Sequence, residues 1–209
     1  SETQDFGTKV TDLTFLDEAL AKLTLPGDVG IFNTLQATKA HLSGQAAPSS
    51  TLPSHNHPIQ WNNLSELDLT PEAIIKTNKG DISIELLPNI APGSVANFLQ
   101  LIKDGFYEGR TFHRVIPNFV AQVGEVKPAE KENLNYNIRS EVSELNYDKA
   151  GLVGMAHAGS NTESTHFFIT HSPTPHLDGN YTIFARLKSG EDVLHNLMIG
   201  DAIERITIH

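Results

Sequence analysis

The stretch GFYEGRTFHRVIPNF, residues 105–119, is the part of this chain that decides its fold. Glycines punctuate an aromatic-rich run, and Arg114 stands between a histidine and β-branched residues. Short runs of this kind, bounded by glycine and proline, are typical of brief β-strands joined by tight turns. We therefore expect strands at residues 111–115 and 119–123.

Two further blocks follow in the chain, MAHAGSNTESTHFFIT at residues 155–170 and HLDGNYTIF at residues 176–184. Together the three blocks resemble the cyclophilin family of peptidyl-prolyl isomerases, and the resemblance runs from about residue 73 to residue 209. It implies a mainly β fold, a closed eight-stranded antiparallel barrel capped by two helices. It also implies an enzyme that isomerises X-Pro bonds and needs no cofactor.

The hydrophobic pattern of the same region indicates many short strands and two helices. Ile82, Ile84 and Leu86 alternate with polar residues after a turn signal, which predicts a hairpin. A helix is expected to begin at Pro92 and to end at Gly105. A second helix is expected at residues 191–198, before a closing strand at 203–208. Periodicity alone does not distinguish a capped barrel from a sandwich.

Residues 1–42 form a separate region, in which residues 13–42 show two apolar repeats of helical spacing broken by Pro26 and Gly27. We expect a helical hairpin, with Thr14 and Asp28 near its helix starts. It resembles the end of a HEAT-like repeat array, an arrangement associated with bacterial proteins, and implies further helical repeats upstream. Residues 43–72 read as a linker and lead-in, and Trp61 is expected to anchor it to residues 73–209.

Composition excludes several classes of function. The chain has 25 acidic and 15 basic residues, a formal net charge of −10, which disfavours binding to nucleic acid or to an anionic membrane surface. No apolar run is long enough for membrane insertion. The chain has no cysteine, so disulfides and thiolate metal sites are excluded. It begins without Met, which suggests a processed product or part of a longer protein. We expect a bacterial cell envelope or periplasmic location, with the cytoplasm as the alternative.

Arg114 is the candidate catalytic residue. The barrier to X-Pro rotation comes from amide resonance, and a permanently charged guanidinium with fixed donors suits the twisted amide. From spacing alone a structural ion pair is the better interpretation, and the resemblance reverses that preference. It also assigns the substrate site to residues of the three blocks: Phe119, Val120, Gln122, Ala156, His157, Ala158, His166, Phe168, His176, Leu177 and Tyr181.

Strand geometry supports part of this assignment, because residues 166 and 168 share one face while 167 and 169 share the other. His157, His166, His176 and Tyr181 replace residues usual in the family. Three histidines converging on one groove raise the question of a metal, but no short ligand spacing occurs and none is expected. Protonation of His157 and His166 would predict weaker activity at pH 5.5. The alternative function is a scaffold that binds proline-containing polypeptides with little turnover.

Overall fold

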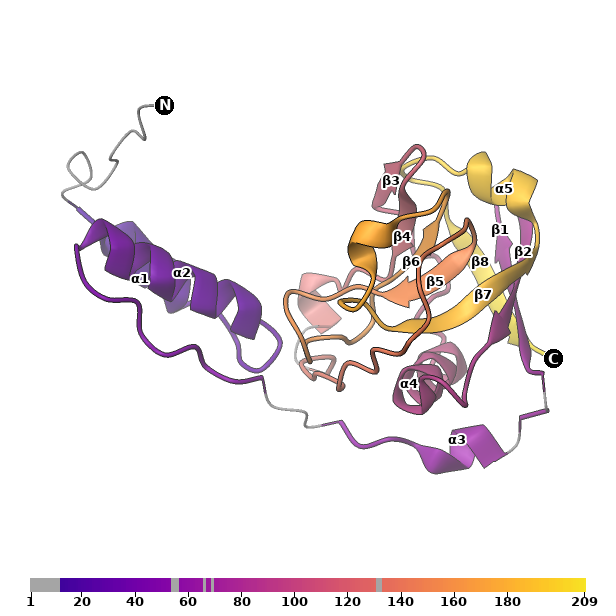
Figure 1. The fold of residues 1–209 in the computed structure, drawn as a ribbon, viewed down its shortest axis with the longest axis horizontal. Helices are drawn as coiled ribbons and strands as arrows, with labels where there is room; N and C mark the ends of the chain where they lie inside the picture. Colours follow the sequence, from indigo (N-terminus) through magenta and orange to yellow (C-terminus); the bar gives the residue numbers. More distant parts are fainter. Residues whose placement is uncertain (1–11, 54–56, 66, 69, 131–132) are drawn as a thin grey trace.

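The computed structural model describes residues 12–53, 57–65, 67–68, 70–130 and 133–209. The strands gather in one body, and a helical hairpin extends from its side (Figure 1). Residues 1–11 of the expected N-terminal extension lie outside the described residues. No helix within these ranges is both long enough and apolar enough to cross a bilayer.

Eight strands form a single curled sheet, and all its neighbouring strands are antiparallel. Their order across the sheet is β3-β4-β6-β5-β7-β2-β1-β8. In chain order the strands are β1 (Glu72–Thr77), β2 (Gly80–Leu86), β3 (Arg114–Ile116), β4 (Val120–Val123), β5 (Leu152–Met155), β6 (Phe167–Thr170), β7 (Ile183–Ser189) and β8 (Ile203–Ile208).

The sheet is an open half-barrel with two edges, β3 and β8, so the expected closed barrel is wrong. β3 has three residues and ends at Ile116, where Pro117 begins the turn to β4. The segment before β3 meets the start of β8 at one isolated bridge, between Thr111 and Ala202, and Ile203 exchanges backbone hydrogen bonds with Gly109 and Arg110. Phe112 N–H also donates to Asp201 O at 2.8 Å, and Gly200 N–H donates to Phe112 O at 3.0 Å, so these segments are held together without extending the sheet.

Helix α4 (Pro92–Lys103) covers the inner face of the sheet, and α5 (Glu191–His195) precedes β8 (Figure 1). Pro92 stands in the first turn of α4, and Gly105 follows its end with a φ of 67°, as the sequence predicted. The Glu141 carboxylate accepts hydrogen bonds from the N–H groups of Gly93 and Ser94, both at 2.8 Å. It thereby satisfies donors that the helix itself leaves unpaired and complements its dipole.

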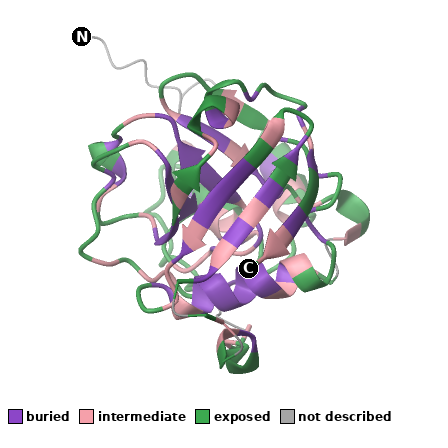
Figure 2. Ribbon diagram, turned by 90° about the vertical axis from the view of Figure 1, so that its right-hand side faces the viewer, coloured by how far each residue is buried: buried purple, intermediate pink, exposed green. Residues whose placement is uncertain are grey.

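The main core lies between the sheet and α4, where buried side chains of both elements meet (Figure 2). Phe98 of α4 packs edge-on against Phe167 of β6, with ring centroids 5.6 Å apart, and also touches Phe184 of β7. All three rings are at most 1% exposed. Edge-to-face pairs of this kind add to the free energy of burial. The aromatic cluster therefore fixes α4 on the sheet.

The expected hairpin is formed by α1 (Thr14–Leu20) and α2 (Val29–Leu42). Thr14 is the first residue of α1 and its N-cap is Leu13, so the expected capping arrangement is wrong. Asp28 is the N-cap of α2, but its carboxylate accepts a hydrogen bond from Thr24 N–H. The linker folds back along α2, where the Asn33 side chain bonds both backbone groups of Thr51.

The lead-in carries a short helix, α3 (Trp61–Ser65), that packs on α4. The expected anchoring role of Trp61 is wrong, because its side chain is 62% exposed. Asn63 does the anchoring instead. Its amide donates to Gln100 Oε1 at 3.1 Å and accepts from Lys103 Nζ at 2.8 Å. The part of the chain that the structure describes also has the 3₁₀ turns η2 (Pro128–Glu130) and η3 (Pro175–Leu177).

Candidate active site

The turn between β3 and β4 positions the first two candidate residues, Arg114 and Phe119. Pro117 and Asn118 occupy its two central positions, Asn118 has a φ of 59°, and Phe119 N–H donates to Ile116 O at 3.0 Å. These are the features of a type II turn. The turn brings the Phe119 ring back beside Arg114, whose guanidinium carbon lies 5.4 Å from the ring centroid. That separation is within the range of a cation–π contact.

Sheet register then sets three candidate side chains in a row. Arg114 on β3 is paired with Gln122 on β4, and Gln122 is paired with Phe168 on β6. Directly paired residues project from the same face of a sheet. Arg114 Nη1 donates to Gln122 Oε1 at 3.3 Å, a long hydrogen bond that orients the exposed guanidinium. A fixed cation and an amide therefore stand beside an aromatic ring.

A pocket of about 220 Å³ opens beside this row. Nine of the twelve residues that the sequence singled out line it, and they come from the three strands β3, β4 and β6, from η3 and from loops. These lining residues are Arg114, Phe119, Val120, Gln122, Ala156, His157, Phe168, Leu177 and Tyr181.

The floor of the pocket is apolar and forms a cluster separate from the main core. Val120, Phe168 and Leu177 are between 2% and 7% exposed. Phe168 faces this cluster, whereas its neighbours Phe167 and Ile169 belong to the main core, as strand alternation requires. A small apolar floor beside a cation can bind a compact apolar ring while the cation reaches the polar group attached to it.

Two residues that support the floor were missed in the sequence. Tyr147 is completely buried, and its ring stacks on Phe168 with centroids 5.9 Å apart. Gly154 lies under both side chains. A Cβ there would stand 2.1 Å from the Tyr147 hydroxyl and 2.5 Å from the Phe168 ring, so no larger residue fits. Gly154 was visible only as one of several glycines, and Tyr147 lies in no strand pattern.

One wall of the pocket is a stacked pair, His157 on Tyr181, with ring centroids 4.2 Å apart and an interplanar angle of 18°. Gly159 N–H donates to His157 Nδ1 at 3.0 Å, so that nitrogen must be an acceptor without a proton. The neutral ring therefore carries its proton on Nε2, which donates to Asn180 O at 2.8 Å. Both ring nitrogens are engaged, and His157 acts as a fixed wall.

Comparisons with known proteins identify this arrangement. The family model for "Cyclophilin type peptidyl-prolyl cis-trans isomerase/CLD" matches residues 73–208. The chain belongs to the cyclophilin-type isomerase family. A peptidyl-prolyl cis-trans isomerase of Synechococcus elongatus is 44% identical over 66% of this chain and 95% of its own length. A peptidyl-prolyl cis-trans isomerase of Helicobacter pylori is 42% identical over 71% of this chain and 94% of its own length.

Solved structures agree with the family assignment. A cyclophilin-type isomerase from Cryptosporidium parvum superposes with a TM-score of 0.60 at 32% identity, covering 67% of this chain and 98% of its own. A second structure of that protein, determined in the presence of the dipeptide Ala-Pro, gives a TM-score of 0.59 at the same identity, covering 66% and 98%. The catalytic part of this cyclophilin is therefore similar to complete proteins of the family.

Three residues predicted for the site do not line the pocket of this cyclophilin. His176 lies on η3 with its ring 5.2 Å from Phe119, and Ala158 follows His157 on the rim. His166 is largely buried beside His113, with ring centroids 5.4 Å apart. Burial, reinforced by His113, lowers the pKa of His166 to about 4. The expectation that His166 gains a charge at pH 5.5 is therefore wrong, and the three histidines do not converge.

A buried carboxyl lies behind the pocket wall. Glu163 is fully buried, and its Oε1 accepts a hydrogen bond from Thr182 Oγ1 at 2.8 Å. Burial raises the pKa of Glu163 to about 7, although hydrogen bonds from Thr182 and Ser140 oppose the rise. Thr182 lies between Tyr181 of the wall and Ile183 of the floor, so Glu163 supports the site from within.

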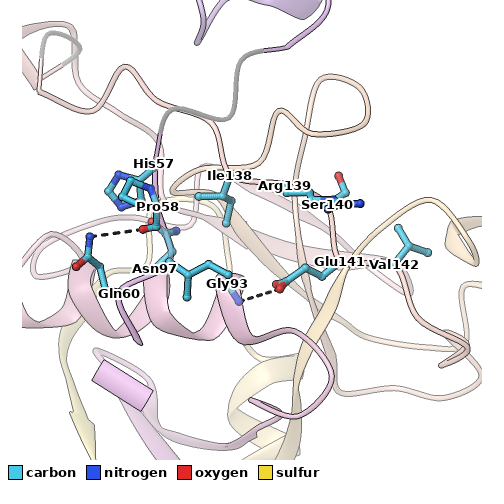
Figure 3. Close-up of a pocket in the computed structure, with 11 residues that line it drawn as sticks. His57, Pro58, Gln60, Gly93, Asn97, Ile138, Arg139, Ser140, Glu141 and Val142 are labelled. Atoms are coloured by element: carbon cyan, nitrogen blue, oxygen red, sulfur yellow. Dashed lines mark hydrogen bonds between the residues drawn. The ribbon is translucent and has the colours of Figure 1, made fainter. Parts of the chain in front are cut away.

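A larger pocket, of about 400 Å³, lies elsewhere, between the lead-in and the N-terminal end of α4 (Figure 3). Glu141 projects into it but is committed to capping α4, and His57 is stacked on Tyr136 with centroids 4.0 Å apart. Arg139 and Asn97 also line this larger pocket, but the row that sets a cation and an amide beside the buried Phe168 ring lies at the smaller one. Size alone therefore does not select the active site.

Proposed function

We propose that this cyclophilin accelerates rotation about X-Pro bonds in polypeptides, with Arg114 as its catalytic residue and the apolar pocket as its proline site. The observation that carries the assignment is the row formed by Arg114, Gln122 and Phe168 across three adjacent strands. It sets a permanent positive charge beside a buried aromatic floor. Proline-containing segments of unfolded chains or loops are the substrates, and the reaction assists protein folding.

The chemistry requires no bond to be made or broken. Unaided rotation takes tens to hundreds of seconds, because amide resonance must be lost as the bond twists. In the twisted amide the nitrogen regains a lone pair, to which a guanidinium N–H can donate a hydrogen bond. Since Arg114 is oriented by Gln122 before substrate arrives, its donors need little reorganisation. Stabilising the twisted form by about 7 kcal/mol would accelerate rotation by roughly 10⁵.

The pocket has a different task, which is to hold the proline ring while the bond rotates. Val120, Phe168 and Leu177 contribute apolar surface and no hydrogen-bonding groups from their side chains. They bind the ring equally well in either isomer, because the ring itself does not change. Binding there lowers KM, whereas Arg114 acts on the twisted amide and raises kcat.

The alternative is a scaffold, in which the pocket binds proline-containing partners with little turnover. The replacement of familiar groove residues by His157 and Tyr181 is what favours it. A protease-coupled assay on a short X-Pro tetrapeptide separates the two functions. Isomerisation at least a hundredfold above the uncatalysed rate supports the enzyme. Peptide binding by calorimetry with no acceleration would support the scaffold.

The assignments made for the rest of the chain stay predictions. The family match begins at residue 73, beyond the α1–α2 hairpin. Half-exposed apolar residues of that hairpin, Phe15 and Ile31, would suit the packing of further helical repeats. An envelope location is tested by fractionating cells that express the tagged natural gene. Recovery of the protein with cytoplasmic markers would contradict it.

A further inference from the structure

The hairpin is fixed to the catalytic region through the turn between its two helices. Gly27 N–H donates to Asn135 Oδ1 at 2.8 Å, and Asn135 Nδ2 donates to Leu25 O at 3.0 Å. A third hydrogen bond runs from Asn137 Nδ2 to Pro26 O at 2.9 Å, and Asn137 is only 1% exposed. Three hydrogen bonds to backbone groups define one orientation of the turn.

Helix α2 then lies directly against the loop that forms the pocket wall. A Cβ on Gly30 would stand 2.3 Å from the carbonyl oxygen of Ala158 and 2.8 Å from its Cβ. Only glycine allows so close an approach. Ala158 directly follows His157 and lies two residues beyond Ala156, both of which line the pocket. The first turn of α2 therefore stands at the end of the proposed groove, and Figure 1 shows the α1–α2 hairpin beside the loops of the strand-rich body.

This contact limits how far a bound peptide can run. The Ala158 N–H is already donated to Thr162 Oγ1 at 2.9 Å, and the Ala158 carbonyl faces the α2 backbone. The chain from Ala156 to Ala158 spans at most about 7 Å, which is the length of two extended residues. A peptide that follows the wall past His157 therefore meets the helix after about two residues.

We propose that the residue 24–30 turn and the start of α2 close one end of the groove and restrict the enzyme to segments that turn away there. Favoured substrates are loops and short peptides, in which the chain leaves the surface soon after the proline. Long extended chains are excluded on that side only. This inference rests on the proposed function, because it takes the pocket as the proline site.

Two variants of the full chain test the closure. Gly30→Leu places a side chain where Ala158 already stands and should displace α2 from the wall. Ala37→Leu adds the same side chain at an exposed position of the same helix and serves as the matched control. Each is assayed with an X-Pro tetrapeptide and with two series extended by up to six residues, one at the N-terminal end and one at the C-terminal end.

For the unmodified protein and Ala37→Leu, extension at one end should lower kcat/KM at least threefold, and extension at the other end should have little effect. Gly30→Leu should abolish that difference while leaving tetrapeptide turnover within about twofold. Equal kcat/KM for both extended series in the unmodified protein would overturn the proposal. The proposal would also be overturned if Gly30→Leu kept the difference in kcat/KM between the two series. For that result to count, faster amide exchange at residues 157–159 must show that the helix has moved.

A second variant covers the case in which Gly30→Leu does not fold. In Gly27→Cys with Asn135→Cys, a Cβ on residue 27 would lie 3.6 Å from the Cγ position of residue 135, close enough for a disulfide to form. The oxidised form should discriminate against the extended series. Reduction should weaken this discrimination, because the two hydrogen bonds of Asn135 are gone and only the one from Asn137 to Pro26 O still holds the turn. If the oxidised and reduced forms discriminate equally between the tetrapeptide and the extended peptides, the result would count against the closure. If the tetrapeptide binds without turnover, the proposed function fails, and affinities for the two series still test the closure.

Discussion

Strand β6 contributes to two apolar clusters with different consequences. Phe167 and Ile169 enter the main core, where neighbouring rings enclose them completely. Phe168, between them, enters the groove floor, whose rim of Phe119, Ala156 and Tyr181 is only partly buried. The enclosed cluster stabilises the fold, and the open one retains a surface for a ligand. Substitutions of adjacent residues in β6 are thus expected to affect different properties, stability for Phe167 and substrate binding for Phe168.

The largest effect is expected for Phe167→Ala. Removal of a fully buried ring leaves a cavity and should lower the free energy of unfolding by about 3–5 kcal/mol. Denaturant unfolding measures the loss, and kcat/KM per folded molecule should stay within about twofold of the unmodified protein. A large kinetic defect in the folded fraction would show that the two clusters are not separable.

Glu163 lies where the two clusters meet, since Ile138 N–H of the main core donates to its backbone carbonyl at 2.8 Å. Its pKa of about 7 is raised above the unfolded value of 4.5, so the folded state holds the proton more tightly. The corresponding stability is complete below pH 4.5 and is lost as the pH rises through 7. Glu163→Gln cannot ionise and should therefore become more stable than the unmodified protein by up to about 3 kcal/mol at pH 8.

Unfolding by denaturant at pH 5, 6, 7 and 8 follows this difference. The advantage of Glu163→Gln should grow across that range and level off above pH 7. A stability difference between the two proteins that does not change with pH would mean that folding does not shift the pKa of Glu163. A decrease with pH would reverse the assigned direction of its pKa shift.

Phe168→Ala should cost less stability, about 2 kcal/mol, because one side of the ring already faces a pocket. Its main effect should be on binding, with a KM for an X-Pro tetrapeptide raised about tenfold and a smaller change in kcat. Steady-state kinetics alongside denaturant unfolding provide both values. If Phe168→Ala behaves like Phe167→Ala in both measurements, the division of β6 between core and groove is wrong.

The smallest effect is expected for His166→Gln. Because its pKa is about 4, His166 stays neutral from pH 7.5 to pH 5.5 and contributes no titration there. The pH dependence of kcat/KM over that range should be the same in the variant. A profile that flattens in His166→Gln would show that the ring does gain a proton during catalysis.

The sequence predicted the residues of the groove better than the architecture of the sheet that surrounds it. Alternation along residues 166–170 separated Phe168 from the core residues Phe167 and Ile169, and the blocks that resemble the family, with the strand expected at residues 119–123, contained all nine residues that line the pocket. Closure of the sheet was predicted wrongly, because strand patterns do not show that residues 109–112 contact the start of β8 without forming a strand. Tyr147 and the contact of Gly30 with Ala158 depend on segments far apart in the chain. No local pattern of residues records contacts of that kind.

The central claim is that the Arg114 guanidinium stabilises the twisted X-Pro bond. The most direct test is kcat/KM for an X-Pro tetrapeptide in Arg114→Ala, with Arg114→Lys as a variant that keeps the charge and loses the planar donor set. Since the side chain is exposed, the midpoint of denaturant unfolding should hardly change. We predict at least a tenfold loss in Arg114→Ala, carried mainly by kcat, and a partial loss in Arg114→Lys. A folded Arg114→Ala protein with near-normal turnover would contradict the account.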